Sequence, residues 1–311
     1  MQQREANFAT GRLCLALCIC AALSACLPAG DDDSEGGTID LGSDAVIHPP
    51  IDTGDSDNGT DQSRTLSFGG LTWAVRSATE LSGPGPNYFS DSTEDAWVDS
   101  QGRLHLRVVQ RGGNWWCTQV AAIGQVGYGT YVFYVSGNVH WMDQNIVLGF
   151  FTWDDNAYEV GHLNEIDIEI TRWGNPVWRN LHYSVQPLYG PDTENERYDE
   201  RSDSAIFVLF DPKSTHTFSW RPDGVNFASY AGYGNPTVLE LNSWHFSAAN
   251  PARRSHEASL STPVGIPVPS ATTAICINLW LTDKNKDGIG DPPSDSADQE
   301  VIIDSFEYTP M

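Results

Sequence analysis

The chain has 311 residues, of which 41 are Asp or Glu and 17 are Lys or Arg, so its formal net charge is -24 and its sequence pI is near 4.4. This scarcity of basic residues excludes a nucleic-acid-binding protein that works by neutralising phosphates. Apolar residues make up 40% of the chain and aromatic residues 11%, which excludes disorder over the whole length. We therefore expect a folded protein with no nucleic-acid partner.

Residues 1–26 have the composition of an export signal, because Arg4 and Arg12 precede a mostly apolar run of thirteen residues from Leu13 to Ala25. That run fits the roughly 7–15 residues of a signal peptide and is shorter than the roughly 20 that span a membrane. Leu23-Ser24-Ala25-Cys26 resembles a bacterial lipobox, in which the Cys sulfur receives a diacylglycerol. An ordinary cleavage site beside a Cys is the alternative. The prediction is an exported, cell-envelope protein with a lipid anchor at Cys26, in the outer membrane or at the cell surface.

Residues 27–63 contain ten Asp or Glu, no Lys or Arg and no aromatic side chain. Such a segment buries too little apolar surface to offset the entropy of ordering, and its like charges repel. A calcium site is the alternative, but the irregular spacing of the acidic residues favours a disordered acidic linker.

The third segment, residues 64–311, is typical of an all-β protein. Short apolar or alternating runs predict strands over 104–109, 129–135, 146–151, 164–170, 180–187, 206–210 and 301–306, with turn-forming residues between them. No internal repeat is present, so a propeller or solenoid is disfavoured. We expect a monomeric β-jelly-roll sandwich, concanavalin-like, of two curved antiparallel sheets.

Two cysteines of this segment, Cys117 and Cys276, occur in strand-like contexts. In an exported protein they could form a disulfide that closes a long loop. Two buried free thiols are the alternative, because pairing cannot be decided without a distance.

Three carboxylates alternate with isoleucines in the segment from Asn164 to Ile170. On a strand, Glu165, Asp167 and Glu169 project from one face while the isoleucines pack into the core. A merely solvated acidic face would favour alternating signs, since neighbouring like charges destabilise a strand. The row therefore indicates chemistry.

Such a row suits glycoside hydrolysis, which needs one ionised and one protonated carboxyl group beside the scissile bond. Crowded negative charges raise the pKa of one member, so that it can donate a proton near neutral pH. Glu165 and Glu169 lie about 13 Å apart along a flat strand at about 3.3 Å per residue. Retaining hydrolysis needs about 5–5.5 Å between the carboxyl groups, so we expect a curved sheet with a substrate cleft on its concave face.

The block from Glu165 to Glu169 resembles the E-x-D-x-E signature of glycoside hydrolase family 16, the lichenase and laminarinase group of β-glucanases. Further similarities follow in order along the third segment, at Ser82–Tyr88, Trp97–Asp99, Gly102–Leu106, Gly127–Tyr131, Thr171–Pro176, His216–Trp220 and Asn278–Leu281. The family has a jelly-roll fold. The resemblance therefore covers nearly all of the third segment.

The resemblance implies a role for each carboxylate. Glu165 matches the nucleophile that forms a covalent glycosyl-enzyme, Glu169 the general acid/base, and Asp167 the carboxylate that shares a proton with the nucleophile. The anomeric configuration would be retained, and no cofactor is required. The Thr171–Asn175 segment departs from the F-L-G of lichenases, so the glycan is not fixed by the motif.

Sugar binding uses flat apolar faces with polar edges, which Trp and Tyr supply. The candidates near the active strand are Trp115, Trp116, Trp141, Trp173 and Trp178, each with a scaffold role as the alternative. Trp220 and Trp280 lie inside strand-like runs and are expected in the core. In the strand over 180–187, His182, Ser184 and Gln186 share one face and can bond to substrate or to the acid/base, with a structural His182 as the alternative.

A second motif, Asp283-x-Asn285-x-Asp287-Gly288-x-x-Asp291, matches the start of an EF-hand-like calcium loop. The twelfth position is Ser294 rather than Glu, and no flanking helices are predicted. A structural Ca²⁺ and a plain acidic hairpin loop therefore both remain open.

Together these features predict a retaining, endo-acting β-glycosidase that hydrolyses β-1,3 or mixed β-1,3/1,4 glucans, with a polysaccharide as its partner. A transglycosylase would use the same residues, and a non-catalytic glycan-binding sandwich would share the fold. The lectin-like alternative has no need of both glutamates.

Overall fold

The computed structural model describes residues 64–155, 164–186, 188–190, 193–197, 201–233, 239–247 and 265–311. The signal peptide, the lipid attachment at Cys26 and the acidic linker concern residues 1–63, which lie outside the described residues, so these three stay predictions. A search of the described ranges finds no helix with the length and apolar character that a membrane span requires.

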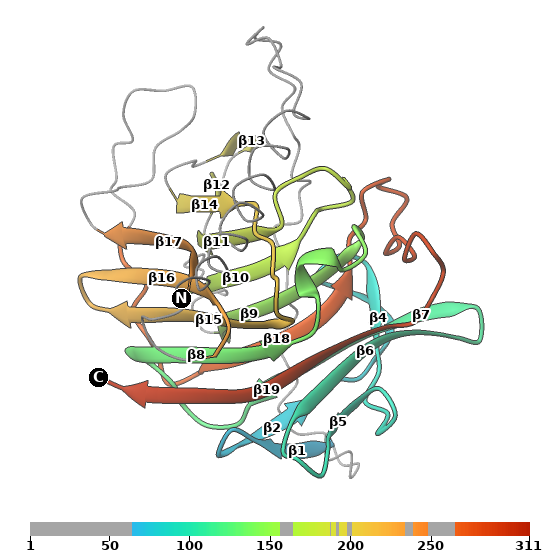
Figure 1. Cartoon of the computed structure of the whole chain (residues 1–311), viewed down its shortest axis with the longest axis horizontal. Helices are drawn as coiled ribbons and strands as arrows, with labels where there is room; N and C mark the ends of the chain where they lie inside the picture. The colour runs from blue at the N-terminus through green and yellow to red at the C-terminus, as the bar shows by residue number, and fades with distance from the viewer. Residues whose placement is uncertain are drawn as a thin grey trace, which may run out of the picture. The chain divides into compact units, whose positions relative to one another are not determined.

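Two antiparallel β-sheets make up most of the described chain (Figure 1). Sheet I contains, in spatial order, β1 (Thr65–Phe68), β2 (Leu71–Val75), β7 (Asn114–Ala122), β18 (Thr273–Leu281), β9 (Ile146–Asp154), β10 (Ile166–Thr171), β11 (Leu181–Val185) and β14 (Ser202–Ala205). Sheet II contains β5 (Ala96–Val98), β6 (Leu104–Arg111), β19 (Gln299–Pro310), β8 (Gly129–Ser136), β15 (Lys213–Arg221), β16 (Gly224–Ala231) and β17 (Glu240–Ser247).

The two sheets are continuous at one edge, where β6 pairs with β7. The short strand β4 (Asn87–Phe89) pairs with β7 in parallel, and β3 (Ala78–Ser82) pairs with β4. The remaining elements are a β12 (Tyr189–Gly190) and β13 (Thr193–Arg197) ribbon and the 3₁₀ turn η1 (Val139–Trp141). The all-β sandwich expected from the strand pattern is thus confirmed.

The hydrophobic core lies between the sheets. Phe133 of β8 and Phe150 of β9 stack across it with ring centroids 4.4 Å apart. The isoleucines of β10 are fully buried in the same core. Because side chains alternate along a strand, the carboxylates between them emerge on the opposite face of sheet I.

Six of the seven strands predicted by residue range are present, as β6, β8, β9, β10, β11 and β19. The strand predicted over 206–210 is wrong, although its alternation is real: Phe207 and Leu209 are buried, and Phe210 is 96% exposed. The Asn180 side chain explains the difference, because its amide group accepts from Phe207 N at 2.8 Å and donates to Phe207 O at 3.0 Å. A side chain thus takes the place of a neighbouring strand.

Of the two alternatives left open for Cys117 and Cys276, the structure has the second, because both cysteines are buried free thiols and form no disulfide. Cys276 lies opposite Ala121 in the register of β18 with β7. Ala121 is four residues from Cys117, roughly 13 Å along the strand, which exceeds the reach of a disulfide. Burial raises the pKa of the Cys117 thiol to about 12, so it is an inert part of the packing.

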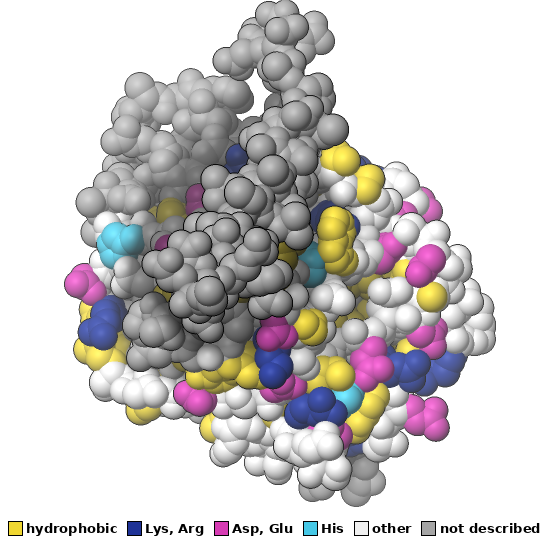
Figure 2. Space-filling model, viewed as in Figure 1, with side chains coloured by type: hydrophobic (Ala, Val, Ile, Leu, Met, Phe, Trp, Pro, Cys, Tyr) yellow, Lys and Arg dark blue, Asp and Glu magenta, His cyan; other side chains and the backbone are white. Residues whose placement is uncertain are grey.

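The face of the molecule seen in Figure 2 carries acidic and basic side chains beside one another rather than in separate patches. Ion pairs of the described chain include Arg107 with Asp298 at 3.1 Å and Arg103 with Asp99 at 2.7 Å. Both pairs are partly exposed, so each contributes little to stability.

A buried carboxylate ends β9 and ties three segments together. Asp154 accepts hydrogen bonds from Thr273 Oγ1 at 2.7 Å and from Ser270 Oγ and Thr272 Oγ1 at 2.8 Å each. It also accepts from Asn164 Nδ2 at 3.3 Å, the residue before Glu165. Burial acts to raise the pKa of Asp154, but these four donors outweigh it, so the net pKa is lowered.

Asp154→Asn is expected to lower the free energy of unfolding by about 2 kcal/mol at pH 7, because hydrogen bonds to a charged group are lost. A carboxylate with a lowered pKa stabilises the fold above its unfolded pKa of about 3.9, and this contribution disappears as the pH falls through the folded pKa. Urea unfolding at pH 7 and pH 3 should therefore show a smaller difference from wild type at pH 3. The exposed Asp223→Asn is the control. An equal loss at both pH values would contradict this account.

Candidate active site

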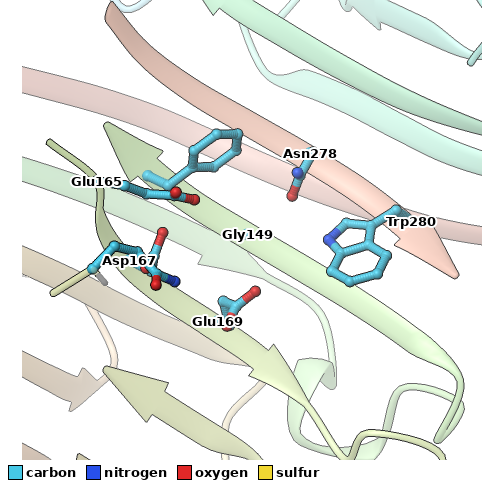
Figure 3. Close-up of a pocket in the computed structure, with 8 residues that line it drawn as sticks. Gly149, Glu165, Asp167, Glu169, Asn278 and Trp280 are labelled. Atoms are coloured by element: carbon cyan, nitrogen blue, oxygen red, sulfur yellow. The ribbon is translucent and has the colours of Figure 1, made fainter. Parts of the chain in front are cut away.

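Three carboxylates lie in a row at the outer face of sheet I. Glu165 immediately precedes β10, and Asp167 and Glu169 lie on it. Figure 3 shows their side chains directed toward one pocket, with Asn278 and Trp280 of β18 on its other side and Gly149 of β9 between. The strand alternation expected from the sequence brings the three together.

The pocket is partly open to solvent, and the empty space within it, the solvent-open part included, is about 260 Å³. It is lined by Gly149, Phe151, Glu165, Asp167, Glu169, Gln186, Asn278 and Trp280. No Lys, Arg or His is among these lining residues, and two of them are aromatic. Carboxylates, two amides and two aromatic side chains in one pocket suit a neutral polyhydroxylated ligand better than an anion.

Glu165 and Asp167 form a buried, hydrogen-bonded carboxyl pair. Their side chains are only 3% and 4% exposed. Burial raises the pKa of Glu165 well above its ordinary value, and the charges of Asp167 and Glu169 raise it further. Burial also raises the pKa of Asp167, to about 6, although its hydrogen bonds oppose this. Because both pKa values are raised, the pair resists losing both of its protons near neutral pH.

Ser184 of β11 and Gln186, which directly follows that strand, stabilise the ionised form of Asp167. Ser184 Oγ donates to Asp167 Oδ2 at 2.6 Å, and Gln186 Nε2 donates to the same oxygen at 3.4 Å. The β10–β11 register places Ser184 directly opposite Asp167. The sequence had placed Ser184 and Gln186 on one face, and both reach the middle carboxylate of the row.

Gly149 keeps the floor of the pocket free. It lies opposite Glu169 on one side and opposite Asn278 on the other. A Cβ at this position would lie 2.4 Å from Asn278 Oδ1. Asn278 is 1% exposed, and its Oδ1 has no hydrogen-bond partner among the described residues. A buried acceptor without a partner at a pocket wall is suited to a hydroxyl of a ligand.

Trp280 forms the end of the pocket, with Trp173 packed behind it. The two rings meet edge to face at 6.0 Å, and Trp173 meets His182 at 5.9 Å. Trp173 has a φ of 50°, which is unusual for a bulky residue. Trp173 is half-buried and supports Trp280 through this contact, but it is not among the residues that line this pocket, so its role in sugar binding stays a prediction.

The other predicted sugar-binding residues lie away from this pocket. Trp116 packs on Tyr88 at 5.4 Å, and Trp141 is 67% exposed with Arg172 over its ring at 5.1 Å. Trp178 lies in the loop after β10, and Trp115 is in the hydrophobic core. Of the predicted set, Gln186 alone lines the pocket.

His182 lies opposite Glu169 in the strand register, but its ring points toward backbone carbonyls. His182 Nε2 is 3.2 Å from Thr171 O and 3.1 Å from Arg179 O, so it donates to the loop that follows β10. This contact supports the structural role that was left open for His182.

The calcium-like loop packs on the turn after β10, where a Cβ on Gly174 would lie 2.7 Å from Lys284 Cβ. Its carboxylates already accept hydrogen bonds within the loop: Asp283 from Asp287 N at 3.1 Å, and Asp291 from Lys284 N at 2.6 Å. Among the residues that the structure describes, no three His, Cys, Asp or Glu side chains are grouped to hold a metal. Calcium binding through Asp283, Asn285, Asp287 and Asp291 stays a prediction.

The sequence reasoning missed Gly149, Phe151 and Asn278, and it assigned Trp280 to the core alone. Trp280 is indeed 1% exposed, yet its edge lines the pocket. One signal was present: Asn278 is the only amide in the otherwise apolar Thr273–Leu281 strand, two residues from Trp280. Trp220 is in the core as expected.

Comparisons with known proteins find structural relatives only. No protein-family model matches the sequence, and no curated protein sequence matches it. Among solved structures, the chain resembles a Mycobacterium tuberculosis protein described as an immunostimulatory antigen and pseudo β-1,3-glucanase, at 18% identity and a TM-score of 0.55 over 77% of this chain and 91% of that one. It also resembles the Bacillus licheniformis β-glucanase, at 16% identity and a TM-score of 0.50 over 81% and 100%.

A third similar structure is a glycosyl hydrolase family 16 protein from Mycobacterium smegmatis, at 14% identity and a TM-score of 0.50 over 76% of this chain and 91% of that one. Identities this low establish a shared fold. The chain therefore has the β-jelly-roll sandwich fold of these proteins, as the sequence resemblance implied.

Proposed function

We propose that this protein is a retaining endo-β-glucanase of glycoside hydrolase family 16 type, acting on β-1,3 or mixed β-1,3/1,4 glucans. The observation that carries the proposal is the row Glu165, Asp167 and Glu169 lining one open pocket, with two of its members in a proton-sharing pair. Double-displacement hydrolysis needs two carboxyl groups that flank the scissile bond, and this row supplies them at one pocket. The shared fold supports the same assignment.

In the proposed reaction, Glu169 protonates the glycosidic oxygen while Glu165 attacks the anomeric carbon and forms a glycosyl ester. Glu165 must be ionised to attack, so the proton of the pair has to reside on Asp167 at that moment. The hydrogen bond between Glu165 and Asp167 provides a direct route for this transfer. Glu169 then removes a proton from water, which hydrolyses the ester and restores the pair.

The sugar at the reacting centre would be held by Phe151, Trp280 and Asn278. The two aromatic side chains offer flat apolar surfaces, and Asn278 Oδ1 offers an acceptor for a hydroxyl group. A wrong sugar that lacked this hydroxyl would leave the amide oxygen unpaired, which is a strong basis for discrimination.

Gly149→Ala is expected to raise the KM for the preferred glucan about tenfold, with a smaller effect on kcat. The new methyl group would push Asn278 Oδ1 from a position 2.4 Å away, and the displaced amide would enter the pocket. Steady-state kinetics check this. Gly265→Ala is a control for glycine replacement, because no atom lies within 4 Å of its Cβ position and its φ is not positive. An unchanged KM in Gly149→Ala would show that this space is not used by substrate.

A hydrolysis panel with laminarin, lichenan, xyloglucan and agarose tests the proposed substrate class. Release of reducing ends from laminarin or lichenan, with oligosaccharides as early products, is expected. Activity confined to xyloglucan or agarose would overturn the substrate class, and activity on none would overturn the function. Added oligosaccharide acceptors distinguish hydrolysis from transglycosylation, because a transglycosylase would give longer products.

Non-catalytic glycan binding is the second candidate, and one observation favours it: a protein of the same fold is described as a pseudo β-1,3-glucanase. A binding module would still bind laminarin or lichenan but release no reducing ends. Binding by calorimetry alongside the hydrolysis panel separates the two candidates.

A further inference from the structure

The hydrogen-bond ladder between β9 and β10 ends beside Glu165. The paired residues run from Thr171 opposite Val147 to Asp167 opposite Phe151. Beyond that point β9 continues as far as Asp154 and keeps its pairing with β18 on its other edge, but it has no further pairing with β10. The segment that carries Glu165 therefore leaves the regular ladder on its β9 side.

At this point a single side-chain hydroxyl, that of Thr152, replaces main-chain groups of β9 as the hydrogen-bonding partner. Thr152 Oγ1 accepts a hydrogen bond from Ile166 N at 3.0 Å and donates one to Asn164 O at 3.0 Å. In a ladder that continued, these backbone groups would bond to main-chain groups of β9. Thr152 thus holds the peptide groups on both sides of Glu165.

The other side of the same segment is held by β11, because Gln186 N donates to Glu165 O at 3.0 Å. Asn164 is fixed in addition through its side chain, which donates to Val268 O at 2.6 Å. Thr152 and Ile166 are both fully buried, so water cannot replace the hydroxyl in its bond to Ile166 N.

A small displacement of the segment that carries Glu165 changes the position of its carboxyl group relative to Asp167 and Glu169. The groups that face the Glu165 carboxyl are Asp167 and Glu169 on its own strand and the Cys276 thiol on β18. The bond to Asp167 and the distance to Glu169 both depend on where the Glu165 backbone lies. A displacement of about 1 Å in a catalytic group can lower a rate by about 10²-fold.

We propose that Thr152 is a positioning residue, whose hydroxyl sets the place of the Glu165 carboxyl relative to Asp167 and Glu169. The inference rests on the proposed function for its catalytic consequence. Its structural consequence, the geometry of the carboxyl pair, can be measured independently of activity.

Three variants of the full chain test it. Thr152→Val keeps the shape and removes the hydroxyl, Thr152→Ser keeps the hydroxyl, and Thr118→Val is the matched control. Thr118 is equally buried and donates to a backbone carbonyl, Arg107 O, at 3.1 Å, away from the pocket. If Thr152→Val does not fold, Thr152→Cys replaces it, because a thiol is a poor hydrogen-bonding group.

The first measurement is the pH titration of the Glu165 carboxyl carbon by NMR, with the signal assigned by its absence in Glu165→Gln. Thr152→Val should displace the midpoint by about 0.5 pH unit or more, while Thr152→Ser and Thr118→Val should keep the wild-type midpoint. An unchanged midpoint in Thr152→Val, or an equal displacement in Thr118→Val, would overturn the proposal whether or not the protein is active.

The second measurement is steady-state kinetics on the glucan that wild type hydrolyses. In Thr152→Val, kcat should fall about 10- to 10²-fold with KM within about threefold, and Thr152→Ser should recover most of kcat. A fall in kcat shared by Thr118→Val would overturn the positioning role. A wild-type protein that hydrolyses no glucan would instead overturn the proposed function, and the titration would still decide the role of Thr152.

Discussion

Glu165→Gln is expected to lower glucan hydrolysis by about 10⁴-fold or more, because an amide cannot form the glycosyl ester on which double displacement depends. The reducing-end assay with laminarin or lichenan measures this loss. It is the largest single effect that the proposed chemistry implies for any described residue.

The fold should survive this change. Burial and neighbouring charge raise the pKa of Glu165, which means that its ionised form destabilises the native state near and above neutral pH. A neutral glutamine of similar shape removes that repulsion, so the melting temperature at pH 7 should not fall. Glu80→Gln on the exposed face of β3 is the control for charge loss. More than about 1% residual activity in a folded Glu165→Gln protein would exclude Glu165 as the nucleophile.

Glu169→Gln should produce a different kinetic signature. Loss of a general acid lowers hydrolysis of a polysaccharide by about 10²–10⁴-fold, because the sugar leaving group needs a proton. An aryl β-glycoside with an acidic phenol as leaving group needs little protonation, so its glycosylation step should be much less affected. Comparison of the two substrates in wild type and variant measures this difference.

Equal losses on both substrates would contradict a general-acid role for Glu169 and would point to a role in folding or binding. The pH profile gives a second criterion, since the alkaline limb that reports the acid should disappear in Glu169→Gln. In wild type, the acid limb should reflect the Glu165–Asp167 pair, for which the pKa of Asp167 is raised to about 6.

The carboxylate row could be predicted from sequence because strand alternation is local. Six residues in an alternating pattern are enough to place Glu165, Asp167 and Glu169 on one face, whatever the rest of the chain does. The same alternation predicted that Ser184 and Gln186 share one face of their strand. In the structure both side chains donate hydrogen bonds to Asp167.

The opposite wall of the pocket could not be predicted in this way. Asn278 and Gly149 are more than a hundred residues apart in sequence, and they meet because β18 pairs with β9 in one register. A shift of β18 by one residue would turn the Asn278 side chain to the other face of the sheet, away from the pocket. The free cysteines have the same origin, since the register of β18 with β7 separates Cys276 from Cys117.

Residue type alone does not indicate which tryptophan lines the pocket. Trp141 and Trp280 have the same side chain, but one is 67% exposed on a 3₁₀ turn and the other is 1% exposed and lines the pocket. Trp141 was predicted to bind sugar because it lies near the active strand in sequence. The pairing of β18 with β9 brings Trp280 to the pocket instead. The prediction of a strand over 206–210 was wrong for a related reason, because the Asn180 side chain forms hydrogen bonds with the backbone N and O of Phe207.

Double displacement by the row Glu165, Asp167 and Glu169 is the central step of the proposed function. Proton NMR of the first products released from lichenan or laminarin tests it most directly, because the anomeric signals appear before mutarotation. The β-anomer should form first and the α-anomer should follow only by mutarotation. Initial appearance of the α-anomer would mean a single displacement by water and would contradict the role assigned to Glu165.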